Sequence, residues 1–270
     1  MTSLRVAFVQ GRPIFGETQR NLERGLALAR TVEAELVILP ELWSSGYVFS
    51  SRAELMALAE DAQSGATAQA LVAAARRDKR HYIAGFPELA RGRYFNSALL
   101  VGPRGVKAVY RKLHLFENES RWFTPGDLPL AVHKVGPANV GMLICFDWRF
   151  PEASRVLALQ GADVIAHPSN LVFPNAQEAM RVRALENQLY TVTANRTGTE
   201  ARPAGTVPFT GHSQIVDPHG KVVVRAGKTA AVAMAVDCDL AVARRKRLTA
   251  ITPLFSNRRP EFYRELVKPR

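Results

Sequence analysis

The chain has 270 residues, which is the length of one large domain or two small ones. Apolar residues make up 47% of it and charged residues 22%, and this globular composition excludes a disordered chain, a collagen-like chain and a disulfide scaffold. Lysine and arginine number 36 against 24 aspartates and glutamates, a net charge of +12, which raises the question of an acidic partner.

Strand-like and helical segments follow one another along the whole chain. Apolar runs bounded by turn residues predict strands. Apolar residues at three- and four-residue spacing predict helices, of which the first two would be capped by Thr18 and Thr67. In chain order the predicted elements are a strand at 4–9, a helix at 18–33, a strand at 36–39, a helix at 67–77, strands at 81–84, 98–101, 106–110 and 140–144, a helix at 151–160, a strand at 164–167, a helix at 176–187, strands at 190–194, 213–216, 222–224 and 231–236, and a helix at 239–248.

This order predicts a single α/β domain over residues 1–270, in which helices cover sheets. The sequence contains no low-complexity linker and no internal repeat that would divide the chain. Residues 252–270 are mostly polar with a few apolar side chains. They predict a C-terminal arm that packs on the body or on a partner subunit.

The sequence has no segment typical of export or membrane insertion. No apolar run reaches the ~18 residues of a membrane span, and Gly11, Arg12 and Pro13 interrupt the first apolar run. The two cysteines are Cys145 and Cys238. We therefore expect a reduced, cytoplasmic protein without a membrane partner, in which a thiol can act as a thiol.

Three reactive residues each follow directly on a predicted strand. Glu41 ends the run that begins at Leu36, Lys112 ends the run that begins at Val106, and Cys145 ends the run that begins at Val140. Sites in α/β proteins gather at the carboxyl ends of strands. We therefore expect an acid, an amine and a thiol in one pocket.

The chemistry of these three groups is complementary. A cysteine attacks as the thiolate, and a nearby carboxylate can take its proton as general base. A lysine stabilises the oxyanion that develops on the attacked carbonyl, and the backbone N–H of Phe146 is a second candidate donor at the turn after Cys145. Lys112 should lower the pKa of the thiol and Glu41 should raise it, so the resting protonation state stays open.

The sequence around these residues resembles the nitrilase superfamily of carbon–nitrogen hydrolases. The resemblance covers nearly the whole chain, from Val6 to about Leu248, and the blocks follow in the same order and spacing. The blocks that carry it are Leu39-Pro40-Glu41-Leu42, Tyr110-Arg111-Lys112-Leu113-His114-Leu115-Phe116, Phe123-Thr124-Pro125-Gly126, Cys145-Phe146-Asp147-Trp148-Arg149-Phe150-Pro151-Glu152, His167-Pro168-Ser169-Asn170 and Arg183-Ala184-Leu185-Glu186-Asn187.

The resemblance implies a four-layer α-β-β-α sandwich that pairs into homodimers or higher even-numbered oligomers. It implies Glu41 as general base, Lys112 as stabiliser of the oxyanion and Cys145 as nucleophile. Glu119, seven residues after Lys112, would orient that lysine and the substrate. The implied reaction passes through a cysteine thioester and needs neither a metal ion nor an organic cofactor.

Five further residues near these blocks are expected to contact the oxyanion or the substrate. They are Phe146, Trp148, Asn170, Tyr47 and Phe116. Asp147 and Arg149, on either side of Trp148, are expected to form a structural ion pair beside the nucleophile.

The substrate predicted from the sequence is a small amide, which is converted to a carboxylic acid and ammonia. Hydrolysis of a nitrile to the acid and hydrolysis of an N-carbamoyl amide remain open alternatives. A basic nucleic-acid-binding protein is the alternative from another class, because basic runs lie at 76–80 and 244–247. Neither run is interleaved with aromatic residues, so we expect charged helix ends and no nucleic-acid partner. A thiol redox enzyme is a third alternative, in which Cys238 would be the distant partner of Cys145.

Overall fold

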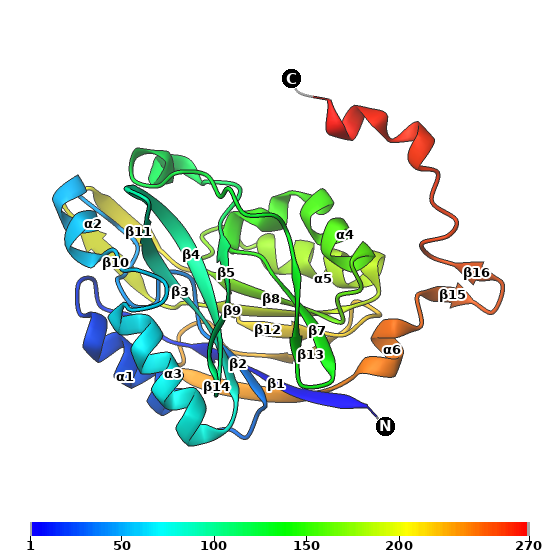
Figure 1. Ribbon diagram of the computed structural model, residues 1–270, viewed down its shortest axis with the longest axis horizontal. Helices are drawn as coiled ribbons and strands as arrows, with labels where there is room; N and C mark the ends of the chain where they lie inside the picture. Colours follow the sequence, from blue (N-terminus) through cyan, green and yellow to red (C-terminus); the bar gives the residue numbers. More distant parts are fainter. Residues whose placement is uncertain (1, 269–270) are drawn as a thin grey trace.

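Two six-stranded sheets form the centre of the computed structural model, which describes residues 2–268 (Figure 1). In each sheet three adjacent inner strands are parallel to one another, and the other neighbouring strands pair antiparallel. The first sheet has the order β14 (Val232–Asp239), β1 (Ser3–Gln10), β2 (Leu36–Ile38), β3 (His81–Ala90), β4 (Arg93–Gly102) and β5 (Gly105–Arg111). The second has the order β13 (Val222–Arg225), β12 (Gln214–Val216), β9 (Tyr190–Asn195), β8 (Val164–Ser169), β7 (Ala138–Met142) and β6 (Val132–Val135).

Two pairs of helices cover the outer faces of the sheets. Helices α1 (Thr18–Ala29) and α3 (Ala66–Asp78) pack on the first sheet, and α4 (Pro151–Leu159) and α5 (Ala176–Asn187) cover the second (Figure 1). The layers therefore follow one another as helix, sheet, sheet, helix, and the predicted four-layer α-β-β-α sandwich is confirmed.

Successive side chains of a strand point to opposite faces of its sheet, so one strand can contribute to two hydrophobic cores. On β1, Val6 and Phe8 face the core between the sheets, whereas Ala7 and Val9 face the core under α1 and α3. Both faces of the strand are buried, which is why it reads as a continuous apolar run. Cys238 is fully buried in the core between the sheets.

The predicted strands all occur, but some helix ends differ. Glu17, not Thr18, is the residue before α1, and that helix ends at Ala29. Thr67 lies inside α3, where the carboxylate of Glu60 accepts hydrogen bonds from its N–H at 2.6 Å and its hydroxyl at 2.8 Å. The sixth helix is shorter than predicted: α6 spans Leu240–Arg244. Elements that the sequence pattern did not predict are α2 (Arg52–Leu58), β10 (Thr199–Arg202), β11 (Gly205–Pro208), β6, β15 (Arg247–Thr249) and β16 (Thr252–Pro253).

The basic runs lie at helix ends, as predicted. Arg76 and Arg77 form the last turn of α3. Lys246 follows α6, and its ammonium donates to the carbonyls of Asn187 and Gln188 at 2.8 and 2.7 Å. These carbonyls end α5, where a cation suits the helix dipole.

The C-terminal segment leaves the body after α6 and carries two short 3-10 turns, η3 (Pro260–Phe262) and η4 (Arg264–Val267) (Figure 1). Ile251 and Val267 are 91% and 84% exposed. Within residues 2–268, no helix combines the length and hydropathy that crossing a bilayer requires.

Candidate active site

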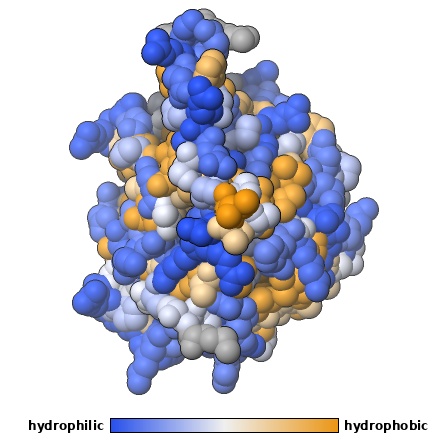
Figure 2. Space-filling model, turned by 90° about the vertical axis from the view of Figure 1, so that its right-hand side faces the viewer, coloured by the Kyte–Doolittle hydropathy of each residue, from blue (hydrophilic) through white to orange (hydrophobic). Residues whose placement is uncertain are grey.

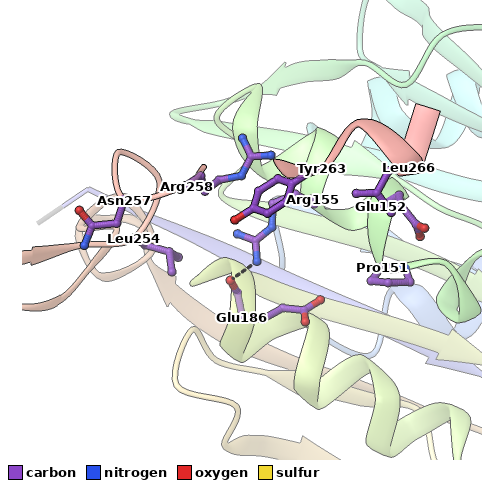
Figure 3. Close-up of a pocket in the computed structure, with 9 residues that line it drawn as sticks. All are labelled: Pro151, Glu152, Arg155, Glu186, Leu254, Asn257, Arg258, Tyr263 and Leu266. Carbon is purple, nitrogen blue, oxygen red and sulfur yellow. Dashed lines mark hydrogen bonds between the residues drawn. The ribbon is translucent and has the colours of Figure 1, made fainter. Parts of the chain in front are cut away.

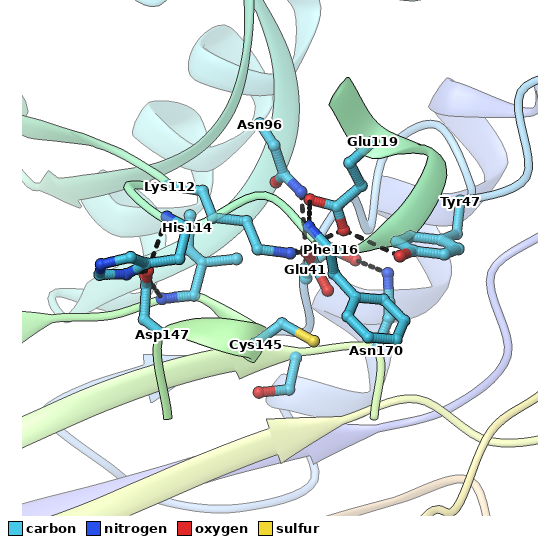
Figure 4. A network of polar contacts seen from close by, with 12 residues as sticks. Glu41, Tyr47, Asn96, Lys112, His114, Phe116, Glu119, Cys145, Asp147 and Asn170 are labelled. Atoms are coloured by element: carbon cyan, nitrogen blue, oxygen red, sulfur yellow. Dashed lines mark hydrogen bonds and ion pairs between the residues drawn. The ribbon is translucent and has the colours of Figure 1, made fainter. Parts of the chain in front are cut away.

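Glu41, Lys112 and Cys145 meet where three strand ends converge (Figure 4). Glu41 follows β2, Lys112 follows β5, and Cys145 begins the 3-10 turn η2 (Cys145–Arg149) after β7. The three residues are 0%, 1% and 5% exposed. The Cys145 side chain points toward the Glu41–Lys112 pair in Figure 4.

Lys112 links two carboxylates. Its Nζ lies 2.8 Å from Oε1 of Glu41 and 2.7 Å from Oε1 of Glu119. Glu119 belongs to the 3-10 turn η1 (Glu117–Arg121), so the spacing of seven residues brings it back over the lysine. Three charged groups are thus buried together, which is tolerable only because each has an opposite charge in contact.

Glu41 is fixed through one carboxylate oxygen and free at the other. Asn96, on β4, donates to Oε1 at 2.7 Å, and Asn170 donates to the backbone carbonyl at 3.0 Å. Oε2 is buried and has no hydrogen-bond partner within residues 2–268. One oxygen therefore holds the side chain in place while the other remains available to accept a proton.

The backbone of β3 approaches the Glu41 segment closely at Gly85. A Cβ on Gly85 would lie 2.5 Å from the Glu41 Cα and 2.4 Å from the Leu42 nitrogen. The Gly85 N–H donates to the Pro40 carbonyl at 3.1 Å, and the Trp43 N–H donates to the Gly85 carbonyl at 2.9 Å. Only glycine permits this approach, and the resulting backbone contacts hold the Glu41 segment against β3.

Cys145 occupies a strained turn between β7 and α4. Its φ of 41° lies in the left-handed region, which is uncommon for a residue with a side chain. Within the described residues 2–268, the N–H of Phe146 has no hydrogen-bond acceptor. A free N–H directly after the candidate nucleophile is the arrangement expected of an oxyanion donor.

Asp147 holds this turn, and its predicted ion pair with Arg149 is wrong. Its fully buried carboxylate accepts hydrogen bonds from the Ile144 N–H at 2.9 Å and the Tyr110 hydroxyl at 2.7 Å. It also accepts from the His114 N–H at 3.1 Å. Arg149 is exposed instead, with its guanidinium carbon 5.6 Å from the Trp148 ring centroid. Asp147 therefore joins the Cys145 turn to residues on both sides of Lys112.

His167, on β8, hydrogen-bonds the backbone of the Cys145 turn. Its Nε2 lies 2.9 Å from the Cys145 carbonyl oxygen and its Nδ1 lies 3.1 Å from the Thr193 hydroxyl. Burial lowers its pKa, so the ring is neutral. A carbonyl oxygen only accepts, so Nε2 carries the proton and Nδ1 is the acceptor.

The burial and the local charges displace the pKa values of the three central groups. Burial raises the pKa of the Cys145 thiol well above its ordinary value; Glu41 raises it further and Lys112 opposes the shift. Burial lowers the pKa of Lys112, but Glu119 and Glu41 outweigh that effect, and the net shift is upward. Burial raises the pKa of Glu119 against the pull of Lys112. The resting site thus has a protonated thiol beside a permanently charged lysine.

The five further predicted residues are placed as follows. The Tyr47 hydroxyl donates to Oε1 of Glu119 at 2.8 Å. The ring centroids of Phe116, three residues before Glu119, and Phe146, directly after Cys145, are 5.1 Å apart. Trp148 is 5% exposed and contacts Phe146 edge to face at 6.4 Å, so it lies in the core behind the turn. The Asn170 side-chain nitrogen donates to the Glu41 carbonyl, whereas its buried Oδ1 has no hydrogen-bond partner within residues 2–268.

Two cavities lie near the residues described above. A small one, about 90 Å³, borders the cluster at Tyr47 and Glu119 and is also lined by Trp122 and by Ala204 and Val207 of the β10–β11 hairpin. A larger one, about 460 Å³, lies between α4, α5 and the C-terminal arm and is lined by Arg155, Tyr263 and their neighbours (Figure 3). None of the Glu41, Lys112 and Cys145 side chains lines this larger cavity. Within residues 2–268 no group of three or more His, Cys, Asp or Glu side chains is arranged to hold a metal ion.

The sequence analysis did not predict the roles of Asn96 and His167 or the hydrogen bonds of Asp147. Asn96 and Ser97 form a polar pair inside an otherwise apolar strand, which is a signal that a polar group faces something other than the core. His167 ends an apolar run in the same way as Glu41 does, and it could have been found by the same rule.

Comparison with known proteins identifies the family. The family model for carbon–nitrogen hydrolases matches residues 5–247. A nitrilase from Pyrococcus abyssi is 42% identical over 96% of this chain and 99% of its own length, and an (R)-stereoselective amidase from a Pseudomonas species is 38% identical over 83% of this chain and 81% of its own. The crystal structure of a carbon–nitrogen hydrolase from Helicobacter pylori G27 has a TM-score of 0.86 at 25% identity and covers 99% of both chains.

The chain therefore belongs to the carbon–nitrogen hydrolases of the nitrilase superfamily, and it is an enzyme that hydrolyses carbon–nitrogen bonds.

Proposed function

We propose that this hydrolase cleaves a small, non-peptide amide to a carboxylic acid and ammonia through a thioester on Cys145. The observation that carries the proposal is the cluster itself, in which Lys112 holds Oε1 of Glu41 at 2.8 Å while Oε2 has no partner within residues 2–268. A positioned base, a fixed cation and a thiol are the groups that nucleophilic acyl transfer requires.

In the first stage the Cys145 sulfur attacks the amide carbon, and its proton passes to Oε2 of Glu41. The carbonyl oxygen becomes an oxyanion that Lys112 Nζ and the Phe146 N–H stabilise. The carbon–nitrogen bond then breaks as Glu41 returns the proton to the nitrogen. Ammonia leaves, and the acyl group remains on the sulfur as a thioester.

In the second stage a water molecule takes the place of ammonia. Glu41 accepts a proton from this water as its oxygen attacks the thioester carbon, and the same two donors stabilise the second oxyanion. The carbon–sulfur bond breaks, the thiol regains the proton and the carboxylic acid is released. Both stages use the same base, so the elevated thiol pKa is compatible with turnover: the proton is transferred during attack and not before it.

A direct test replaces each cysteine in turn. Cys145→Ala should reduce ammonia release from small amides by at least about a thousandfold, because no other group can form the acyl intermediate. Cys238→Ala is the matched control, since Cys238 is also a buried free thiol. It should keep the wild-type rate constant, apart from a small loss of stability. Full activity of Cys145→Ala would end the proposal, and loss of activity in Cys238→Ala would favour the redox alternative.

Nitrile hydrolysis is the second candidate because the Pyrococcus abyssi relative at 42% identity is a nitrilase. An N-carbamoyl amide is a third substrate class that the same thiol could attack. Ammonia release should be measured side by side on an amide, a nitrile and an N-carbamoyl compound that share one acyl side chain. We expect the amide to have the highest kcat/KM, and a faster nitrile would reverse the assignment.

We also propose that the enzyme is a homodimer joined through α4 and α5. Their outer faces expose four apolar side chains, and Figure 2 shows apolar patches among the polar side chains on the face that includes the C-terminal arm. The four are Val156, Leu159, Val182 and Leu185, at 38–50% exposure. Burial of such a patch favours association. Sedimentation should give a dimer for the wild type and a monomer for Leu185→Glu; a monomeric wild type would contradict the proposal.

A further inference from the structure

A buried ion pair outside the cluster lies at the junction of β9 and β10. Arg196 and Glu200 have side-chain exposures of 1% and 7%, and Nη1 lies 2.6 Å from Oε2. The guanidinium also donates to the Pro13 carbonyl at 3.3 Å and lies 4.1 Å above the ring of Phe209. Burial of both charges is costly, and apolar side chains could fill the same space. Packing alone therefore does not explain why a charged pair is buried at this position.

Glu200 uses its other oxygen to hold the loop that carries Tyr47. Oε1 accepts the N–H of Tyr47 at 3.0 Å and the N–H of Val48 at 2.5 Å. Phe209, which lies under the Arg196 guanidinium, contacts the Tyr47 ring edge to face at 5.8 Å. The ion pair thus fixes both the backbone and the ring of one tyrosine.

Tyr47 connects this pair to the charged cluster. Its hydroxyl donates at 2.8 Å to Oε1 of Glu119, the same oxygen that lies 2.7 Å from Lys112 Nζ (Figure 4). The position of the hydroxyl therefore decides where this oxygen lies, and this oxygen in turn decides where the Lys112 ammonium lies. A displacement of a positioned group by about 1 Å is enough to cost a large factor in rate.

We propose that Arg196 and Glu200 form a positioning pair for the proposed amide hydrolysis, which acts on Lys112 through Tyr47 and Glu119. Arg196 follows β9 of the second sheet, Glu200 lies in β10 of the separate β10–β11 hairpin, and the Tyr47 loop follows β2 of the first sheet. The pair therefore joins segments that come from both sides of the site. This inference rests on the proposed function, since a positioning role has meaning only for a reaction at Cys145.

The test is a double-mutant cycle on kcat, measured well below the unfolding temperature. Glu200→Gln and Tyr47→Phe should each lower kcat by about tenfold, and the double variant should also lose only about tenfold, because both changes break one path. Multiplication of the two effects to about a hundredfold, or an unchanged kcat in Glu200→Gln, would overturn the proposal.

Asp163→Asn is the matched control for a merely structural effect. Asp163 is 1% exposed, lies 2.8 Å from Arg244 and accepts the Asn139 N–H at 2.8 Å, so it has the same kinds of partner as Glu200 but lies away from the cluster. This variant should have a lower Tm and a wild-type kcat. If Glu200→Gln does not fold, Arg196→Lys keeps the charge but loses the fork that reaches both Glu200 and Pro13, and it should show the same coupling to Tyr47→Phe.

A second measurement separates this inference from the proposed function. The rate of alkylation of Cys145 by iodoacetamide, followed by mass spectrometry, reports the surroundings of the sulfur without any amide substrate. Glu200→Gln and Tyr47→Phe should change this rate by the same several-fold factor. If the wild type releases no ammonia but the alkylation rates change together, the proposed function fails and the positioning role stands. Unchanged alkylation in both variants would reject the positioning role itself.

Discussion

The two sheets contribute different kinds of group to the candidate active site. The first sheet and its loops provide the charged groups, Glu41, Lys112 and Glu119, which are already bonded to one another. The second sheet provides a neutral thiol and, through His167, a neutral support for its turn. The difference teaches that each charged group already has a partner of opposite charge within one half of the site, so the neutral thiol of the other half can approach without adding an unpaired charge.

The largest effect should come from removal of the base. Glu41→Gln should reduce the rate of ammonia release by about a thousandfold, because the thiol loses the group that accepts its proton. The same change should speed the alkylation of Cys145 at pH 8. Glu41 raises the pKa of this thiol, so its removal lowers the pKa and increases the thiolate fraction at a given pH.

These opposite effects distinguish a base from a purely structural carboxylate. The pH midpoint of Cys145 alkylation should therefore lie lower in Glu41→Gln than in the wild type. A midpoint that is unchanged or higher, or a parallel loss of alkylation and turnover, would show that the variant has only disrupted the site.

The next largest effect should come from removal of the cation. Lys112→Met should lower kcat by on the order of a hundredfold, because one oxyanion donor is lost. It should also reduce the free energy of unfolding by about 3–5 kcal/mol, because Glu41 and Glu119 are left buried without a counterion. Lys107→Met, an exposed lysine on the same strand, is the control and should change neither quantity. Thermal unfolding and initial rates measure both; retention of kcat would remove Lys112 from the mechanism.

A smaller effect should follow from loss of the Asn96 side-chain amide, which holds the carboxylate of Glu41 in place. Asn96→Ala removes the hydrogen bond to Oε1 and should lower kcat by about tenfold. Asn139→Ala is a matched change on a strand of the second sheet, where the amide donates to the Gly161 carbonyl instead. Initial rates of the two variants should differ, and equal rates would indicate that the amide of Asn96 does not position the base.

Local sequence patterns were sufficient for the strands and for the three central residues. The apolar runs, such as that of β1, and the turn residues between hairpins reflect short-range geometry, so the strands could be predicted. Glu41, Lys112 and Cys145 could be found because each ends such a strand, and the family resemblance brought Glu119 with them.

The partners of these residues could not be predicted, because they are set by tertiary packing. Tyr47 and Glu200 are 153 positions apart, and no local pattern joins them. Asp147 was assigned to Arg149 from proximity in the sequence, but the turn of η2 aims its carboxylate at Tyr110 on the neighbouring sheet. Thr18 and Thr67 had the residue type of a helix cap, but Glu17 and Gly65 hold the cap positions, and the Thr67 N–H is bonded by the distant carboxylate of Glu60.

The charges of the cluster formed by Glu41, Lys112 and Glu119 also affect product release. One ammonium and two carboxylates leave an excess of negative charge in an enclosed space. In the proposed reaction an uncharged amide would enter this space without electrostatic opposition, whereas the acid formed would ionise and be repelled by it. The arrangement proposed to prepare the thiol for attack would then also expel the product, and we expect little accumulation of the acid in the site.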